Sequence, residues 1–275
     1  MEIPAALRTE WRRERVWLAD LPRLAAECAA QWELVLEEPF DTPRSLVVPA
    51  GEAVLKLNAP SHFEADHEAD ALAFWAGQGA VRLHARDDAR RALLVERCRP
   101  GTELWEIEAD EVAVIAPLLP RLSIAADDGH RFRLLADEAD RWAEELPERY
   151  ARSFEPSLLE YALDVLRSVD RDAAFVVNQD LHAGNVLRAE REPWLVIDPK
   201  PLVGERELDA VGLLRNAGFA GIPHVRRWLD ALADLGLDRE RVRAWGVAHA
   251  LAWGWRDTSG WSRRSVEAAR AIRSA

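Results

Sequence analysis

Residues 174–200 read AFVVNQDLHAGNVLRAEREPWLVIDPK, and this stretch decides the predicted fold. It holds two short apolar segments, FVV and WLVI, and each runs directly into polar residues. The first is followed by Asp180 and then by Asn185, and the second ends at Asp198. Short apolar runs bounded by turn residues are typical of β-strands. We therefore expect two strands that deliver these three polar side chains at their ends.

The three polar residues have the chemistry that phosphoryl transfer needs. That reaction requires a carboxylate to orient the attacking hydroxyl and oxygen ligands to hold Mg²⁺ on the phosphates. Asp180 is suited to the first task, whereas Asn185 and Asp198 are suited to the second, because Mg²⁺ needs only one or two protein ligands beside substrate oxygens and water. Gly184 is expected to let the loop turn tightly enough for Asn185 to point back toward Asp180. The alternative is that Asp180 and Asn185 are ordinary turn formers.

Lysine is almost absent from the chain, since the 36 basic residues include only Lys56 and Lys200. An ammonium group is a compact point charge, whereas a guanidinium is a broad planar fork, so the surviving lysines point to phosphate sites. Lys56 lies in an apolar strand-like run, where a half-buried charge needs a partner. Glu64 and Glu68 share one face of the helix that follows, and we favour Glu68 as the carboxylate that fixes Lys56 against phosphates. An exposed strand-edge lysine is the alternative.

Composition narrows the classes of partner. A formal net charge of −12 argues against nucleic acid, and an acidic surface attracts cationic ligands, although acidity also serves solubility. No apolar run approaches the length of a membrane span, and the N-terminus lacks the layout of a signal peptide, so we expect a cytoplasmic protein. The two cysteines are too few for a disulfide framework. We expect a monomer or a weak dimer.

The N-terminal part of the chain predicts a mostly β region with one inserted helix. Residues 1–30 show helical spacing of apolar side chains, which Pro22 is expected to interrupt. A helix is expected over residues 61–76, with Ser61 as N-cap and Glu64 completing a capping box. The expected strands, which are apolar runs between turn residues, are 32–36, 45–48, 53–57, 81–83 and 92–96.

Helices dominate the C-terminal part. The predicted class is α+β, with a small antiparallel β N-lobe, residues 1–98 including a helical lead-in over 1–30, and a larger, mainly helical C-lobe, residues 99–275. The helices expected from apolar spacing are about 108–120, 131–146, 156–169, 206–216, 223–235, 239–254 and 261–273.

The chain resembles the aminoglycoside phosphotransferases, which have a protein-kinase-like fold, and within them the streptomycin 6-phosphotransferase and hydroxyurea-resistance branch. The resemblance covers roughly residues 45–220 and implies an enzyme that uses ATP (or GTP) and Mg²⁺ to phosphorylate a hydroxyl of a streptomycin-like antibiotic. The segments that carry it are VLK at 54–56, GQGAVRL at 77–83, LLVER at 93–97, QDLHAGN at 179–185 and WLVIDPKPLVGE at 194–205.

The resemblance implies a role for each matching residue of the catalytic region. Asp180 would be the catalytic base, and Asn185 and Asp198 would bind Mg²⁺. Lys56 and Glu68 would form the pair that positions the phosphates.

Further roles follow on the nucleotide side. The backbone of Glu96 and Cys98, beside Val95, would meet the adenine edge. Ser45 or its amide would contact the β-phosphate. The resemblance also makes Asp209 a buried aspartate that braces the catalytic loop.

Two departures from the family pattern concern activity. The family usually has histidine two residues before the catalytic aspartate, where this chain has Asn178. Asparagine also donates and accepts hydrogen bonds, so activity is expected to be retained. The phosphate-covering loop, residues 40–45, has no glycine, which makes close backbone approach harder and predicts a modest nucleotide affinity.

The acceptor site is the least determined part. Lys200 would neutralise charge on the transferred group or form a salt bridge with Glu205 or Glu207. Trp253 and Asp257 are candidates for binding a small cationic substrate, because aromatic faces and carboxylates attract cations.

Three functions remain open on this reasoning. The first is an antibiotic kinase, and the second is a kinase of another hydroxylated metabolite. The third is a nucleotide-binding pseudokinase or regulatory module, which is disfavoured because all four predicted catalytic and nucleotide residues are present.

Overall fold

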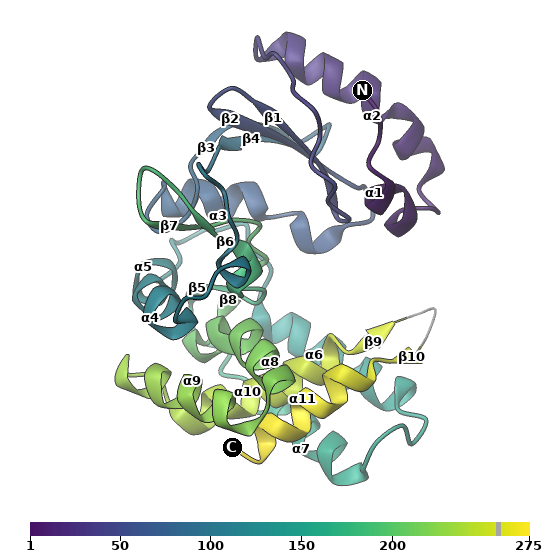
Figure 1. Cartoon of the computed structure of the whole chain (residues 1–275). Coiled ribbons are helices and arrows are strands. Elements are labelled where there is room, and N and C mark those ends of the chain that lie inside the picture. The colour runs from purple at the N-terminus through teal and green to yellow at the C-terminus, as the bar shows by residue number, and fades with distance from the viewer. Residues whose placement is uncertain (257–259) are drawn as a thin grey trace. The chain divides into compact units, whose positions relative to one another are not determined.

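The chain forms two compact units in a computed structural model that describes residues 1–256 and 260–275. The first unit comprises Met1–Thr102 and Leu187–Asp198. The second comprises Glu103–Val186 and Pro199–Ala275. Figure 1 shows the strands of the four-stranded sheet in the first unit and the helices that make up most of the second.

The first unit is built on an antiparallel sheet of four strands in the order β1-β2-β4-β3. The hairpin between β1 and β2 turns at Gly51, which takes a positive φ of 61° and so suits a tight two-residue connection. In this register Lys56 on β2 lies opposite Val47 on β1 and Leu93 on β4, so its backbone is inside the sheet. The strand bounds are Ser45–Ala50 (β1), Ala53–Asn58 (β2), Leu83–Asp87 (β3) and Ala92–Glu96 (β4).

Two N-terminal helices, α1 (Ala5–Glu10) and α2 (Arg15–Gln31), pack against this sheet. Pro22 was expected to interrupt the helical run, but it lies inside α2. Tertiary packing keeps the helix continuous at Pro22, because the neighbouring Leu21 and Ala25 are buried against the sheet. The buried members of this core are Leu7, Trp17, Leu21, Ala25, Cys28, Leu46, Val48, Leu55, Leu57, Ala59 and Ala92.

Three further expectations for this unit are corrected. Residues 32–36 do not form a strand, and Val35 is largely exposed, so no sheet edge buries its side chain. Ser61 does not cap the inserted helix; its hydroxyl donates to Glu14, and the helix α3 begins only at Glu68, after the 3₁₀ turn η1. The strand expected at 81–83 begins at Leu83 instead. Helix α3 spans Glu68–Trp75 and η1 spans Phe63–Ala65.

Residues 187–198 return to the first unit, although they are far from it in sequence. The strand β7 (Trp194–Val196) pairs with β6 (Val186–Arg188), and Val196 also forms a parallel bridge with Ala80. Arg191 anchors this return by binding both carboxylate oxygens of Glu96 (2.7 and 2.8 Å) and the carbonyl oxygens of Gly77 and Ala80 (2.8 and 2.9 Å).

Replacing Arg191 with methionine is expected to destabilise the protein by about 3 kcal/mol, because Glu96 and the buried Ala80 carbonyl lose charge-assisted hydrogen bonds. Denaturant unfolding measures this change. Arg171→Met is the matched control, since Arg171 forms an exposed ion pair with Asp140 and such pairs contribute little. Equal effects of the two substitutions would contradict the anchoring role of Arg191.

The second unit is mainly helical. The helix expected over 108–120 is divided into three short pieces, α4, η3 and α5, because Pro117 and Pro120 each start a new piece. The helix expected over 206–216 starts instead as a 3₁₀ turn over Arg206–Ala210 and continues as α8, and the other helices agree with the expected ones within a few residues. Bounds are Glu111–Ile115 (α4), Ala116–Leu118 (η3), Leu119–Leu122 (α5), Leu135–Arg149 (α6), Pro156–Arg167 (α7), Val211–Ala220 (α8), Ile222–Asp234 (α9), Arg239–Ala252 (α10) and Arg263–Arg273 (α11).

Small pairs of strands complete the second unit. The strand β5 (Phe175–Asn178) pairs antiparallel with β8 (Pro201–Gly204), and the residues between them, 179–200, make up most of the segment quoted at the outset. A second strand pair is formed by β9 (Trp255–Arg256) and β10 (Gly260–Trp261). The unit also has short 3₁₀ turns, which are η2 (Leu104–Glu106), η4 (Ala183–Asn185) and η5 (Arg206–Ala210).

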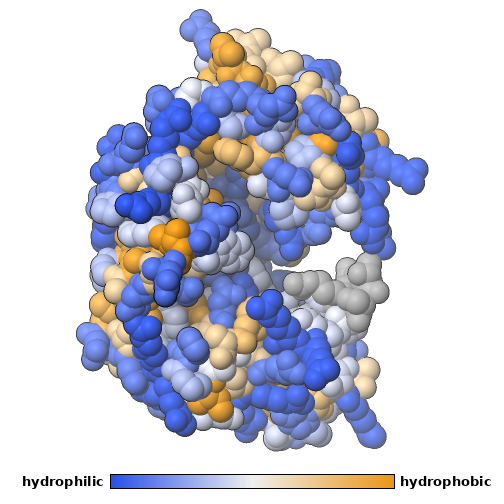
Figure 2. All heavy atoms as spheres, viewed as in Figure 1, coloured by the Kyte–Doolittle hydropathy of each residue, from blue (hydrophilic) through white to orange (hydrophobic). Residues whose placement is uncertain are grey.

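The face drawn in Figure 2 is covered mainly by hydrophilic side chains, with hydrophobic groups in small separate areas. This agrees with the high content of charged residues, 31%. Among the residues described, no helix combines the length and the apolar character needed to cross a membrane.

Candidate functional site

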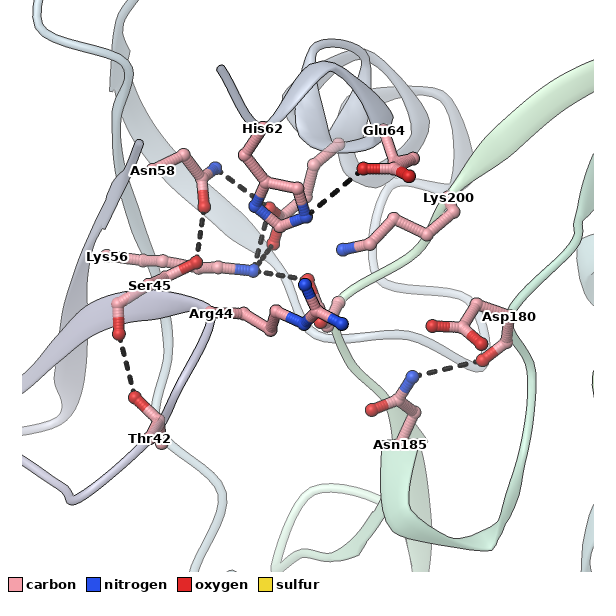
Figure 3. A network of polar contacts seen from close by, with 12 residues as sticks. Thr42, Arg44, Ser45, Lys56, Asn58, His62, Glu64, Asp180, Asn185 and Lys200 are labelled. Atoms are coloured by element: carbon pink, nitrogen blue, oxygen red, sulfur yellow. Dashed lines mark hydrogen bonds and ion pairs between the residues drawn. The ribbon is translucent and has the colours of Figure 1, made fainter. Parts of the chain in front are cut away.

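Lys56 lies at the centre of a buried ion-pair cluster in the first unit (Figure 3). Its Nζ atom is 2.7 Å from both carboxylate oxygens of Glu68 and 2.5 Å from Oδ1 of Asp198. Burial lowers the pKa of Lys56, but the charges of Asp198 and Glu68 outweigh this effect, and the net direction is upward. Lys56 is therefore a permanent cation, and the contact with Glu68 that the sequence favoured is present.

A second layer of polar contacts supports Glu68. Asn58 donates from Nδ2 to Oε2 of Glu68 (3.2 Å) and accepts from the hydroxyl of Ser45 (2.5 Å). Sequence reasoning missed Asn58, although it lies two residues after Lys56 on the same strand and therefore on the same face. The hydroxyl of Ser45 is buried and donates to Asn58, and its carbonyl accepts from Thr42 (2.7 Å). Contact of Ser45 with a phosphate stays a prediction.

Asp198 has a strained backbone. Its φ of 50° lies in the left-handed region, which non-glycine residues rarely adopt. Backbone strain of this kind persists only where surrounding contacts hold it, and it gathers at functional sites. Lys56 supplies such a contact by binding Oδ1.

The loop after β5 places Asp180 and Asn185 close together. Nδ2 of Asn185 donates to the backbone carbonyl of Asp180 (3.0 Å), so Asn185 points back toward Asp180 as expected. The loop makes a tight 3₁₀ turn over Ala183–Asn185, in which Gly184 does not take a positive φ. A Cβ at Gly184 would lie 2.8 Å from the ring of Trp105, so glycine is needed for that close packing.

Asn178 supports this loop from behind. Its side-chain oxygen Oδ1 accepts from the backbone N–H groups of Asp180 (3.1 Å) and Lys200 (2.9 Å). Its own N–H donates to Oδ1 of Asp209 (2.6 Å). Asn178 thus holds two backbone segments by one oxygen atom.

Asp209 is buried, and its environment affects stability. Burial raises the pKa of Asp209 to about 7, against the downward effects of the Asn178 N–H and the charge of Arg206. The folded state therefore holds a proton on Asp209 between the unfolded pKa of 3.8 and about 7, where the unfolded state does not. Its stabilising contribution is greatest below the lower value and is lost as pH rises through that range.

The substitution Asp209→Asn is expected to make stability fall less between pH 4 and pH 7 than in the wild type, because asparagine keeps the acceptor for Asn178 without titrating. Denaturant midpoints measured across this range test the expectation. Asp230→Asn, at an exposed carboxylate, is the control. Parallel curves for Asp209→Asn and wild type would contradict the assignment.

The candidate adenine-edge segment lies at the end of β4 in the first unit. The N–H of Glu96 donates to the carbonyl of Arg82 (2.8 Å), and its side chain is held by Arg191, so its backbone carbonyl is the group that remains to meet a base. Burial, and secondarily the charge of Glu96, raises the pKa of the Cys98 thiol to about 12. Cys98 would therefore contribute its backbone and a neutral side chain, beside Val95.

The residues predicted to bind the acceptor lie in different surroundings. Lys200 is buried, and its N–H donates to Asn178. Glu205, one suggested partner of Lys200, binds Arg241 (2.5 and 2.6 Å) instead. The ring of Trp253 is in cation–π contact with the guanidinium of Arg215, which lies 5.0 Å from its centroid. Asp257 lies outside the described residues.

Sequence reasoning also missed Arg215 on α8. Its Nη2 donates to Oδ1 of Asp180 (2.7 Å), and its side chain is only 13% exposed. A lone charge in the apolar run VGLLRNAGFA was the available indication, since a charge on a buried helix face needs a partner.

A metal ion in this protein would have few protein ligands. Among the described residues, no group of three or more His, Cys, Asp or Glu side chains could hold a metal ion. With Nδ2 of Asn185 bound to the Asp180 carbonyl, its amide oxygen is the atom left for a cation. Carboxylate and amide oxygens fit Mg²⁺, which takes its other ligands from phosphates and water.

Comparison with known proteins agrees with this chemistry. Residues 31–260 match the family model described as aminoglycoside/hydroxyurea antibiotic resistance kinase. The chain is 36% identical to a streptomycin 6-kinase from Streptomyces glaucescens over 91% of this chain and 89% of that protein. It is 38% identical to a hydroxyurea phosphotransferase from Kitasatospora aureofaciens over 91% of this chain and 78% of that protein.

The fold is shared with solved small-molecule kinases. The choline kinase LicA from Streptococcus pneumoniae superposes with a TM-score of 0.67 at 13% identity, over 93% of this chain and 99% of that one. The α+β, protein-kinase-like fold class predicted from the sequence is confirmed, as is the family resemblance.

Proposed function

Because the chain belongs to the aminoglycoside/hydroxyurea antibiotic resistance kinase family, we propose that it transfers the γ-phosphate of ATP to a hydroxyl of a streptomycin-like aminoglycoside. The single observation that carries the acceptor is the 36% identity to a streptomycin 6-kinase over 91% of the chain. The net charge of −12 supports an acceptor that is cationic.

Each of these residues would have a separate role in the reaction. Lys56, fixed by Glu68, would bind the α- and β-phosphates, and the backbone of Glu96 and Cys98 would meet the nucleotide base. Asp180 would accept the proton of the acceptor hydroxyl. With these residues the protein would position and polarise the substrates, which is most of what phosphoryl transfer requires.

Asn185 and Asp198 would hold Mg²⁺, whose positive charge neutralises the phosphate oxygens during transfer. The strained backbone of Asp198 supports this role, since such strain gathers at functional sites. Lys200, two residues after Asp198, would add positive charge near the transferred group.

The domain division, location and assembly of the protein are part of the same proposal. Residues 1–98 would form the nucleotide-binding lobe and residues 99–275 the acceptor lobe. The protein would act in the cytoplasm on free small molecules, as a monomer or weak dimer, without nucleic acid or membrane partners.

A second acceptor is favoured by a specific observation, the 38% identity to a hydroxyurea phosphotransferase. A kinase of a small hydroxylated molecule other than an aminoglycoside would use the same catalytic residues. The acceptor site alone distinguishes the two functions.

Incubation of the purified protein with Mg²⁺ and γ-labelled ATP tests the proposal directly. The acceptors are streptomycin, other aminoglycosides, hydroxyurea and a simple amino alcohol, and label transferred to each is measured. Transfer to streptomycin is the expected result. Transfer to hydroxyurea or the amino alcohol but to no aminoglycoside would overturn the antibiotic assignment, and no transfer to any acceptor would favour a regulatory module.

A further inference from the structure

The carboxylate of Asp180 is approached by two protein groups, and both meet the same oxygen. Nη2 of Arg215 lies 2.7 Å from Oδ1. Nε2 of His182 lies 3.9 Å from Oδ1. Within the described part of the chain, these contacts leave Oδ2 without such a neighbour. The two oxygens of Asp180 are therefore in different environments.

Arg215 also contacts an aromatic side chain. Its guanidinium lies 5.0 Å from the centroid of the Trp253 ring, in cation–π contact. Trp253 in turn packs on the buried His249, with ring centroids 4.6 Å apart. Contact with the ring limits the positions that the planar fork of N–H donors can take.

Helix α8 carries Arg215 and touches the catalytic loop directly. A Cβ added at Gly212 would lie 2.3 Å from the backbone carbonyl oxygen of Leu181, the residue after Asp180. Arg215 is three residues beyond Gly212 and so lies on the same helix face. The absence of a side chain at Gly212 lets the helix approach closely enough for Arg215 to reach Asp180.

Asp180 balances the positive charge of Arg215. Its side chain is 13% exposed, and among the described residues Asp180 is its one acidic partner within ion-pair distance. The second terminal nitrogen, Nη1, is buried and has no hydrogen-bond partner within residues 1–256 and 260–275. A buried arginine with a single carboxylate partner is costly to keep, so the contact points to a role at that carboxylate.

We propose that Arg215 is a positioning residue, which holds Oδ1 of Asp180 and turns Oδ2 toward the acceptor hydroxyl. This inference rests on the proposed function. The hydroxyl oxygen forms a bond to the γ-phosphorus while the bond from that phosphorus to the leaving ADP oxygen breaks, and the hydroxyl proton passes to Oδ2. Correct orientation of the base matters because small misplacements cost large factors in rate.

Kinetics of Arg215→Met test the role. Methionine keeps an unbranched stem against Trp253 and removes the guanidinium. We expect kcat to fall about 10- to 100-fold, with little change in the KM of either substrate, since the interaction serves the transition state. Arg215→Lys should recover part of the loss, because it restores one charged donor.

Arg264→Met is the matched control. Arg264 lies over the ring of Phe219, also on α8, at 4.0 Å from its centroid. Its loss removes a similar cation–π contact with the helix without touching Asp180, so kcat should stay near the wild-type value. An unchanged kcat in Arg215→Met, or a loss that appears only in the acceptor KM, would overturn the proposal. A rise in kcat would also overturn it, by showing that Arg215 blocks Asp180.

A double-mutant cycle on stability separates this inference from the choice of acceptor. Urea midpoints are measured for the wild type, Arg215→Met, Asp180→Ala and the double variant. We expect the midpoint shift caused by Arg215→Met to be at least halved when Asp180 is already alanine, because the two residues form one pair. Equal shifts in both backgrounds would refute the pairing, even if no acceptor is found.

Discussion

Replacing Asp180 with asparagine is expected to lower kcat about 1000-fold, because proton transfer by a positioned carboxylate contributes factors of this order. Asparagine has the same shape and can still accept a hydrogen bond from Arg215, so the fold around the loop should persist. What it lacks is the negative charge that takes up the proton of the acceptor hydroxyl. Phosphate transfer measured under saturating substrates gives kcat directly.

Nucleotide binding separates loss of the base from general damage. The residues proposed to hold the nucleotide are Lys56, fixed by Glu68, and the backbone of Glu96 and Cys98. Asp180 is not among them. The affinity of Asp180→Asn for ATP, measured by calorimetry, should therefore stay close to that of the wild type. Asp230→Asn, at an exposed carboxylate, controls for the chemical change. A wild-type kcat in Asp180→Asn would remove Asp180 from the role of base.

Replacing Lys56 is expected to have the second large effect, and it should act on both stability and turnover. In Lys56→Met, the buried carboxylate of Glu68 and the carboxylate of Asp198 lose the cation that binds both. Breaking a buried ion pair by removing one partner costs about 3–5 kcal/mol. The cation proposed to bind the phosphates is lost as well, so kcat/KM for ATP should fall by about two orders of magnitude or more.

The substitution Lys56→Arg tests the shape of the charge. Three carboxylate oxygens lie within 2.5–2.7 Å of a single Nζ atom. A compact ammonium satisfies this arrangement, whereas a planar guanidinium is too broad. We therefore expect Lys56→Arg to be nearly as impaired as Lys56→Met. The control is the reverse change at a surface position, Arg23→Lys, which should be tolerated. Full activity of Lys56→Arg would refute the argument from lysine scarcity.

Local sequence patterns predicted some elements well and others poorly. The strand β4 has the expected bounds, since an apolar run between turn residues needs little tertiary information. The inserted helix begins seven residues later than expected, because Ser61 donates to Glu14 instead of capping. Pro22 stays in α2 because packing on the sheet outweighs its local effect. In both cases a long-range contact decided the outcome.

The lysine cluster shows a different limit. The pairing of Lys56 with Glu68 was expected from neighbouring elements, because twelve residues separate them. Asp198 is 142 residues from Lys56, and its contact with Nζ was not expected. Asn58 was missed although its position on the strand indicated the right face. Sequence spacing specifies faces, but it does not specify which distant segment meets them.

By itself, the sequence determined the reaction chemistry proposed for this protein. The order of Asp180, Asn185 and Asp198 after short strands, and the retention of lysine at position 56, depend on residue type and local spacing alone. Only the tertiary structure decided what surrounds the proposed base. Arg215 reaches Asp180 across 35 residues, and it does so because Gly212 lets one helix lie against the loop. Such an approach depends on the packing of whole elements, which local periodicity does not encode.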